Sequence, residues 1–80
     1  MNAINIQLSE GQLKLLKDLD NGEYVYSAST SAIDVSMLIE HNLIVKVAND
    51  YRKAGYNLSR IYNVTSLGKQ ILGTYEAGDN

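Results

Sequence analysis

Residues 62–72 read Tyr62-Asn63-Val64-Thr65-Ser66-Leu67-Gly68-Lys69-Gln70-Ile71-Leu72, and they mark the passage from an extended segment into a helix. Thr65 can cap that helix, because a Thr hydroxyl accepts a hydrogen bond from a backbone N–H of the first turn. Apolar residues at helical spacings then form one face: Leu67, Ile71, Leu72 and Tyr75. The stretch predicts a closing helix after Thr65, followed by an acidic, frayed and disordered tail over residues 76–80.

Two segments with β-strand character precede the closing helix, and a polar loop separates them. Leu43 to Ala48 is rich in β-branched residues, and Leu58 to Val64 alternates in the manner of a strand. Residues 49–57 carry turn residues at both ends and a glycine inside, and they are too many for a tight turn. The pattern predicts a β-hairpin with a projecting loop.

The first predicted helix spans about Glu10 to Asp20. Ser9 and Gln12 have the spacing of a capping box, and Asn21-Gly22 supplies a left-handed stop. Before this helix, residues 1–8 alternate apolar and polar side chains, as a short strand or an extended arm would.

A second helix is predicted over roughly Ala32 to His41. Ser31 and Asp34 have the spacing of a cap and its reciprocal partner, and Asn42 stands where a left-handed residue ends a helix. The residues expected to face inward are Ile33, Met37 and Leu38.

Two phrases in this order of elements resemble those of winged-helix proteins. Residues 38–44, Leu-Ile-Glu-His-Asn-Leu-Ile, are similar to the end of a recognition helix that enters the wing, with Asn42 in the place of a glycine. Residues 62–72 are similar to the phrase that leads from the wing into the closing helix. The resemblance implies one α+β domain over residues 1–80, with three helices and a β-hairpin wing. It further implies a DNA-binding transcription regulator of bacterial or bacteriophage type, in the cytoplasm of the bacterial cell.

One departure concerns the helix-turn-helix. Only Ser27 to Ser31 is available for a helix between Tyr26 and the helix at Ala32, which allows about one turn. Either the helix-turn-helix is abbreviated, or the helix placed at Ala32 begins earlier and bends.

The composition excludes several classes of protein. The 80 residues are 45% hydrophobic and 20% charged, which is typical of a globular domain, and the absence of cysteine favours a reducing compartment. No run approaches the roughly 20 apolar residues of a membrane span. The net charge of -2 is unusual for a protein that binds nucleic acid.

The resemblance places DNA contacts on the wing and on the recognition helix. Cations and aromatic rings that suit phosphate contact gather on the wing: Lys46, Tyr51, Arg52, Lys53, Tyr56 and Arg60. The same composition would also suit a solvated loop whose tyrosines pack against the domain and make no contact with DNA. The candidate residues of the helix face are Ser29, Thr30, Ser31, Asp34, Ser36 and Glu40, which also suit an ordinary exposed face.

Charge raises a second hypothesis. No Lys or Arg lies between Lys17 and Lys46, whereas the acidic residues of that interval are Asp18, Asp20, Glu23, Asp34 and Glu40. Because such a surface repels phosphate, the scaffold could instead bind and inhibit a basic host protein through an acidic face, as a bacteriophage inhibitor would. A homodimer is also expected to be possible, through the arm with Ile4 and Ile6 or through the Tyr75 helix.

An enzyme is not expected. His41 is the one histidine and follows Glu40, and adjacent helical residues point about 100° apart, which is poor geometry for a metal or acid–base pair. Gly55 and Gly68 are isolated, so no phosphate-binding loop is predicted. We expect no metal and no cofactor.

Overall fold

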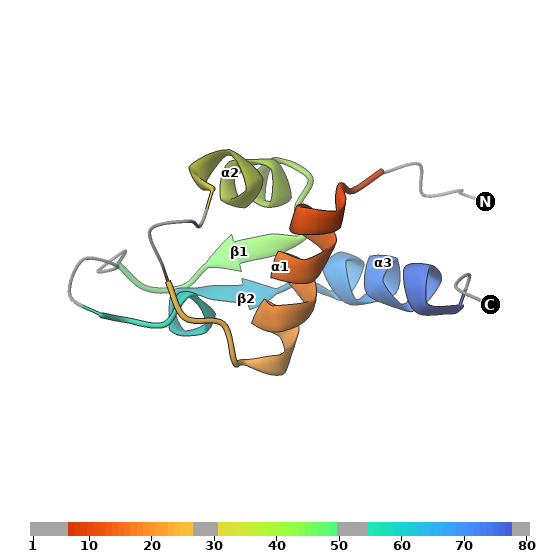
Figure 1. Cartoon of the computed structure of the whole chain (residues 1–80). Coiled ribbons are helices and arrows are strands. Elements are labelled where there is room, and N and C mark those ends of the chain that lie inside the picture. Colours follow the sequence, from red (N-terminus) through yellow and green to blue (C-terminus); the bar gives the residue numbers. More distant parts are fainter. Residues whose placement is uncertain (1–6, 27–30, 50–54, 78–80) are drawn as a thin grey trace.

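The computed structural model describes residues 7–26, 31–49 and 55–77. The described residues form an α+β fold with three α-helices and a two-stranded antiparallel sheet. Helix α1 (Glu10–Asn21) packs against α2 (Ala32–Glu40), against α3 (Ser66–Ala77) and against strand β2 (Tyr62–Val64). Figure 1 shows α1 crossing the sheet, with α2 beside β1 (Ile44–Lys46) and α3 beyond the end of β2.

The first helix forms where its start and stop signals predict. The backbone N–H of Gln12 donates to Ser9 Oγ at 3.2 Å, and the Ser9 N–H donates to Gln12 Oε1 at 3.1 Å, which completes the capping box. Gly22 ends the helix with a φ of 70°. Its inner face contributes Leu15, Leu16 and Leu19 to the core.

Helix α2 begins at Ala32, because Ser31 is extended and its hydroxyl accepts from the Asp34 N–H at 3.4 Å. The alternative that this helix begins before Ala32 and bends is therefore wrong. Residues 27–30 lie outside the described residues. The helix ends at Glu40, one residue sooner than predicted, and Asn42 has the expected left-handed backbone with a φ of 62°.

The inward face of α2 differs from the prediction. Ile33 was expected to point inward, but it is 73% exposed, whereas Val35 and Leu38 are buried. At about 100° per residue, Ile33 lies roughly 160° from Val35 and 140° from Leu38 around the helix axis. Burial of the latter two therefore turns Ile33 toward solvent.

The hairpin is shorter than predicted. Ile44 pairs with Val64, and Lys46 pairs with Tyr62, in antiparallel register. The predicted strand over Leu58 to Val64 is wrong in its first half, where Leu58–Arg60 forms a 3-10 helix, η2. Leu58 and Ile61 are both fully buried. Residues an odd number apart point to opposite faces of a strand, so the 3-10 turn is what allows both to enter the core.

Helix α3 meets the chain after α2 at a junction formed by Asn42, Leu43, Thr65 and Gly68. The Thr65 hydroxyl donates to Asn42 O at 2.6 Å and accepts from the Gly68 N–H at 3.0 Å, as the predicted cap requires. The Thr65 N–H donates to Leu43 O at 3.0 Å. One side chain thus caps α3 and fastens it to the left-handed turn.

Gly68 is buried where α3 touches this turn. A Cβ at this position would lie 2.7 Å from Val64 Cγ1 and closer still to the carbonyl oxygen of Leu43. Only glycine therefore permits this approach of helix to backbone.

The two ends of the chain differ from the expectations in small ways. Helix α3 continues to Ala77, two residues into the predicted tail, and residues 78–80 lie outside the described residues. Residues 1–6 of the predicted arm also lie outside them, and Gln7 and Leu8 belong to no strand. None of the helices in the described part of the chain has the length and apolar character needed to cross a membrane.

The core lies between α1, the sheet and the other two helices. Its buried residues are Leu15, Leu16, Leu19, Val35, Leu38, Leu43, Ile44, Leu58, Ile61, Tyr62, Ile71 and Leu72. Every described helix and strand contributes at least one of them, so each is anchored in the core.

Candidate interaction surfaces

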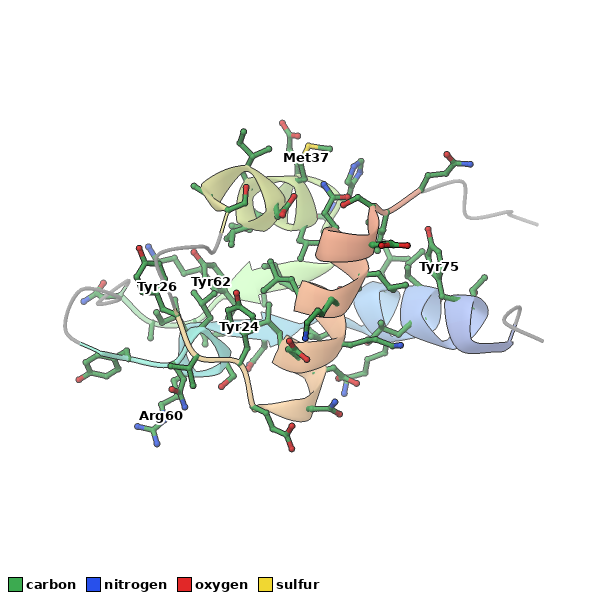
Figure 2. All side chains as sticks on the ribbon, in the orientation of Figure 1. Tyr24, Tyr26, Met37, Arg60, Tyr62 and Tyr75 are labelled. Carbon is green, nitrogen blue, oxygen red and sulfur yellow. The ribbon has the colours of Figure 1, made fainter. Side chains whose placement is uncertain are left out.

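The face of α2 that is turned away from the core carries Ile33, Ser36, Met37 and Glu40, and we call it the α2 face. Ile33, Ser36 and Glu40 are exposed and Met37 is half-buried. Figure 2 shows Met37 on the side of α2 that points away from the sheet. The α2 face therefore combines two apolar side chains with one carboxylate, and α2 contains no Lys or Arg.

Two of the predicted helix-face residues point elsewhere. Ser31 uses its hydroxyl to cap α2. The carboxylate of Asp34 accepts a hydrogen bond from Gln12 Nε2 at 3.3 Å, and its other oxygen lies beside Gly11. Asp34 thus joins α2 to the start of α1. Ser29 and Thr30 lie outside the described residues, so Ser36 and Glu40 are the predicted residues found on the α2 face.

The acidic residues between Lys17 and Lys46 do not gather on one surface. Asp18 pairs with Lys14 at 3.2 Å, and Asp20 pairs with Lys69 of α3 at 3.3 Å. Glu23 follows the last turn of α1, which is the end of this helix farther from α2 in Figure 1. With Asp34 turned toward α1, Glu40 is the acid of this interval that lies on the α2 face.

The described cations of the predicted wing lie on the hairpin. Lys46 ends β1 and Arg60 ends η2, and both are exposed. Figure 2 shows Arg60 extending away from the domain. No carboxylate among the described residues lies within ion-pair distance of either cation. Tyr56 is also exposed, whereas Tyr51, Arg52 and Lys53 lie outside the described residues.

The outer face of the sheet is a second apolar feature that the sequence reasoning did not identify. Val45 lies in β1 and Val47 lies just after the end of β1, and both are about half exposed. The signal was present in the sequence, since a two-stranded sheet with one covered face leaves alternate residues of its strands in solvent.

A groove of about 480 Å³ runs along α1 beside Leu72 of α3. Its lining residues are Glu10, Leu13, Lys14, Lys17, Asp18, Asp20, Asn21 and Leu72. Because Lys14–Asp18 and Lys69–Asp20 are ion pairs, most of the charge here is neutralised within the protein. This groove was also missed from the sequence, because it depends on how α1 and α3 pack.

The titratable side chains are the candidates for a metal or acid–base site. Within residues 7–26, 31–49 and 55–77, no group of three or more His, Asp or Glu side chains could hold a metal ion. His41 follows α2 as its C-cap residue, and its backbone N–H donates to Met37 O at 3.0 Å.

Of the segments expected to mediate a dimer, the Tyr75 helix is described and the Ile4 and Ile6 arm is not. Tyr75 is half-buried against the core, and its hydroxyl oxygen accepts a hydrogen bond from the Leu8 N–H at 2.8 Å. Tyr75 is therefore used within the chain.

Comparisons of the chain with models of protein families, with curated proteins and with solved structures found no match.

Proposed function

We propose that this chain is a small winged-helix protein of bacterial or bacteriophage type that binds another protein through its α2 face. The order of α1, α2, the hairpin and α3 supports the winged-helix assignment. The junction of Asn42, Thr65 and Gly68 supports it as well, because it gives the two phrases of the resemblance a shared role in packing. The proposal places the protein in the cytoplasm, because a chain without cysteine has no disulfide that a reducing environment would break.

The observation that carries the proposal is the composition of the α2 face. A helix that enters the major groove needs polar or cationic side chains, because it reads base edges between two rows of phosphates. The α2 face instead offers Ile33, Met37 and the carboxylate of Glu40. Covering an isoleucine that is 73% exposed would contribute about 1 to 2 kcal/mol to an association.

Photo-crosslinking tests the proposal. A benzophenone side chain replaces Ile33 in one variant and Val25, which is 55% exposed, in a control variant. Added to an extract of the source cells, the first variant should give a discrete protein adduct that is absent from the control. An excess of unlabelled wild-type protein should compete the adduct away, and an excess of an Ile33→Ser, Met37→Ser variant should not. Equal adducts from both positions, or no protein adduct, would contradict the proposal.

Duplex DNA remains a second candidate because Lys46 and Arg60 have no carboxylate partner among the described residues. If the hairpin contacts two phosphates, Lys46→Ala with Arg60→Ala should reduce the magnitude of the negative slope of log K against log salt by about 1.8. The matched control is Lys14→Ala with Lys69→Ala, which removes two ion-paired cations and the same net charge. Anisotropy titrations of a labelled mixed-sequence duplex measure both slopes, and equal slopes or no binding at low salt would reject this candidate.

A further inference from the structure

Glu40 occupies an electrostatically unfavourable position. It lies in the last turn of α2, where the unpaired backbone carbonyls form the negative end of the helix dipole, and that turn has no basic residue. The residues one turn before it are Ser36 and Met37, so the helix itself supplies no counter-charge. No cation among the described residues forms an ion pair with Glu40. A carboxylate in this place opposes the local field, and folding gives no reason for it.

The spacing along the α2 face adds a geometric condition. Ile33, Met37 and Glu40 follow one another at i, i+4 and i+7, which places them on one stripe of the helix. At 1.5 Å per residue the stripe is roughly 10 Å long. Along the stripe, two apolar side chains are followed by a negative charge. One side of an amphipathic helix laid along it could contact all three.

A second copy of this chain that pairs through its own α2 fits the stripe poorly. An α2 helix from another copy contains no Lys or Arg, so it could cover Ile33 and Met37 but would bring no cation of its own to Glu40. A phosphate backbone would meet the carboxylate with a like charge. A partner that satisfies the whole stripe must combine apolar and cationic side chains.

We propose that the α2 face docks an amphipathic, basic helix of another protein. The apolar side chains of that helix cover Ile33 and Met37, and a Lys or Arg of its flank pairs with Glu40. This inference rests on the proposed function, because it names the partner of the same surface. It requires the affinity to depend on both the exposed isoleucine and the isolated carboxylate.

Three synthetic helical peptides of 14 residues test the proposal. Each carries leucine along one face, and the remaining positions are lysine, glutamine or glutamate. Calorimetric titration of the whole protein at physiological ionic strength should show that the lysine peptide binds about tenfold more tightly than the glutamine peptide, and the glutamate peptide least. Ile33→Ser should lower the affinity for the lysine peptide and for the glutamine peptide by about tenfold each. Glu40→Gln should lower the affinity for the lysine peptide by about fivefold and leave the affinity for the glutamine peptide unchanged.

Two control variants make the result specific. Glu23→Gln removes the same charge from an exposed acid at the far end of α1, and Val25→Ser removes an exposed apolar side chain outside α2. Neither should change the affinities. Circular dichroism of each variant checks that the helices remain.

The outcomes separate this inference from the proposed function. Binding that depends on Ile33 but shows no preference for lysine, or no loss in Glu40→Gln, would overturn the basic helix while the α2 face remained an interface. An equal loss in Glu23→Gln and Glu40→Gln would overturn it as a general charge effect. If no peptide bound in a manner that depends on Ile33, both proposals would fail.

Discussion

The backbone N–H of Leu8 donates a hydrogen bond to the hydroxyl oxygen of Tyr75 at 2.8 Å, across 67 positions of sequence. Leu8 immediately precedes the cap of α1, and Tyr75 lies in the last full turn of α3. Both side chains pack against the core. The segment that enters the first helix is therefore held by the last one.

Tyr75→Phe should lower the free energy of unfolding by about 1 kcal/mol, because the half-buried Leu8 N–H loses its acceptor while the ring remains. Urea denaturation measures the loss. Amide hydrogen exchange should accelerate at Leu8. The control is the N–H of Glu23, which bonds Asp18 O at the other end of α1, and its exchange should accelerate only as much as the global loss of stability requires. Unaltered exchange at Leu8 would show that the bond does not form in solution.

Gly68→Ala should destabilise the fold by about 3 kcal/mol or more, because the added methyl group meets Leu43 O and Val64 Cγ1 in a packed junction. Gly73→Ala is the matched control in the same helix. No atom lies within 4 Å of its added Cβ, so it should stabilise the protein by about 0.5 to 1 kcal/mol through helix propensity. Thermal denaturation followed by circular dichroism compares the two, and equal effects would disprove the close approach.

Thr65→Val should cost about 2 kcal/mol, because it removes the cap of α3 and the bond to Asn42 O while preserving the shape of the side chain. Thr74→Val makes the same substitution where the exposed hydroxyl bonds only Gln70 O within its own helix, and it should change stability by less than about 0.5 kcal/mol. Chemical denaturation of both variants measures the difference. A loss of similar size in each would mean that the junction contributes nothing.

Asn42→Ala should destabilise the protein by about 1 kcal/mol, because alanine tolerates a φ of 62° less well than asparagine does. Asn42→Gly should leave stability unchanged or raise it slightly, since glycine adopts this backbone without a steric penalty. The bond from Thr65 reaches the backbone carbonyl and survives in both variants. The order Gly, Asn, Ala in denaturation midpoint is the expected result, and any other order would contradict it.

The sequence predicted those parts of the fold that depend on local chemistry. The capping box of Ser9 and Gln12, the left-handed Asn42 and the Thr65 cap are each determined by a few neighbouring residues, and all three are confirmed. The strand expected over Leu58 to Val64 is wrong in its first half, because alternation does not distinguish a strand from a 3-10 turn that buries Leu58 and the following Ile61.

The candidate site could be predicted less well, because it depends on which face of each element is covered. Ile33 was assigned to the core on helical spacing, and the burial of Val35 and Leu38 reverses that assignment. The acidic interval suggested one negative surface. Three of its members instead bond to residues outside the interval. Asp18 pairs with Lys14 one turn earlier in α1, whereas Asp20 and Asp34 meet Lys69 and Gln12, which become their neighbours only through the tertiary fold.

The junction around Gly68 has a consequence for tracing the ancestry of this chain. Its contacts involve the backbone of residues 42 and 43, one hydroxyl and one missing side chain, so they constrain few positions and leave the α2 face free to diverge. Descendants that acquired other partners should retain a left-handed Asn or Gly before a buried Leu, and a Thr with a Gly three residues later. That sparse pattern, rather than overall identity, is the mark by which distant relatives would be recognised.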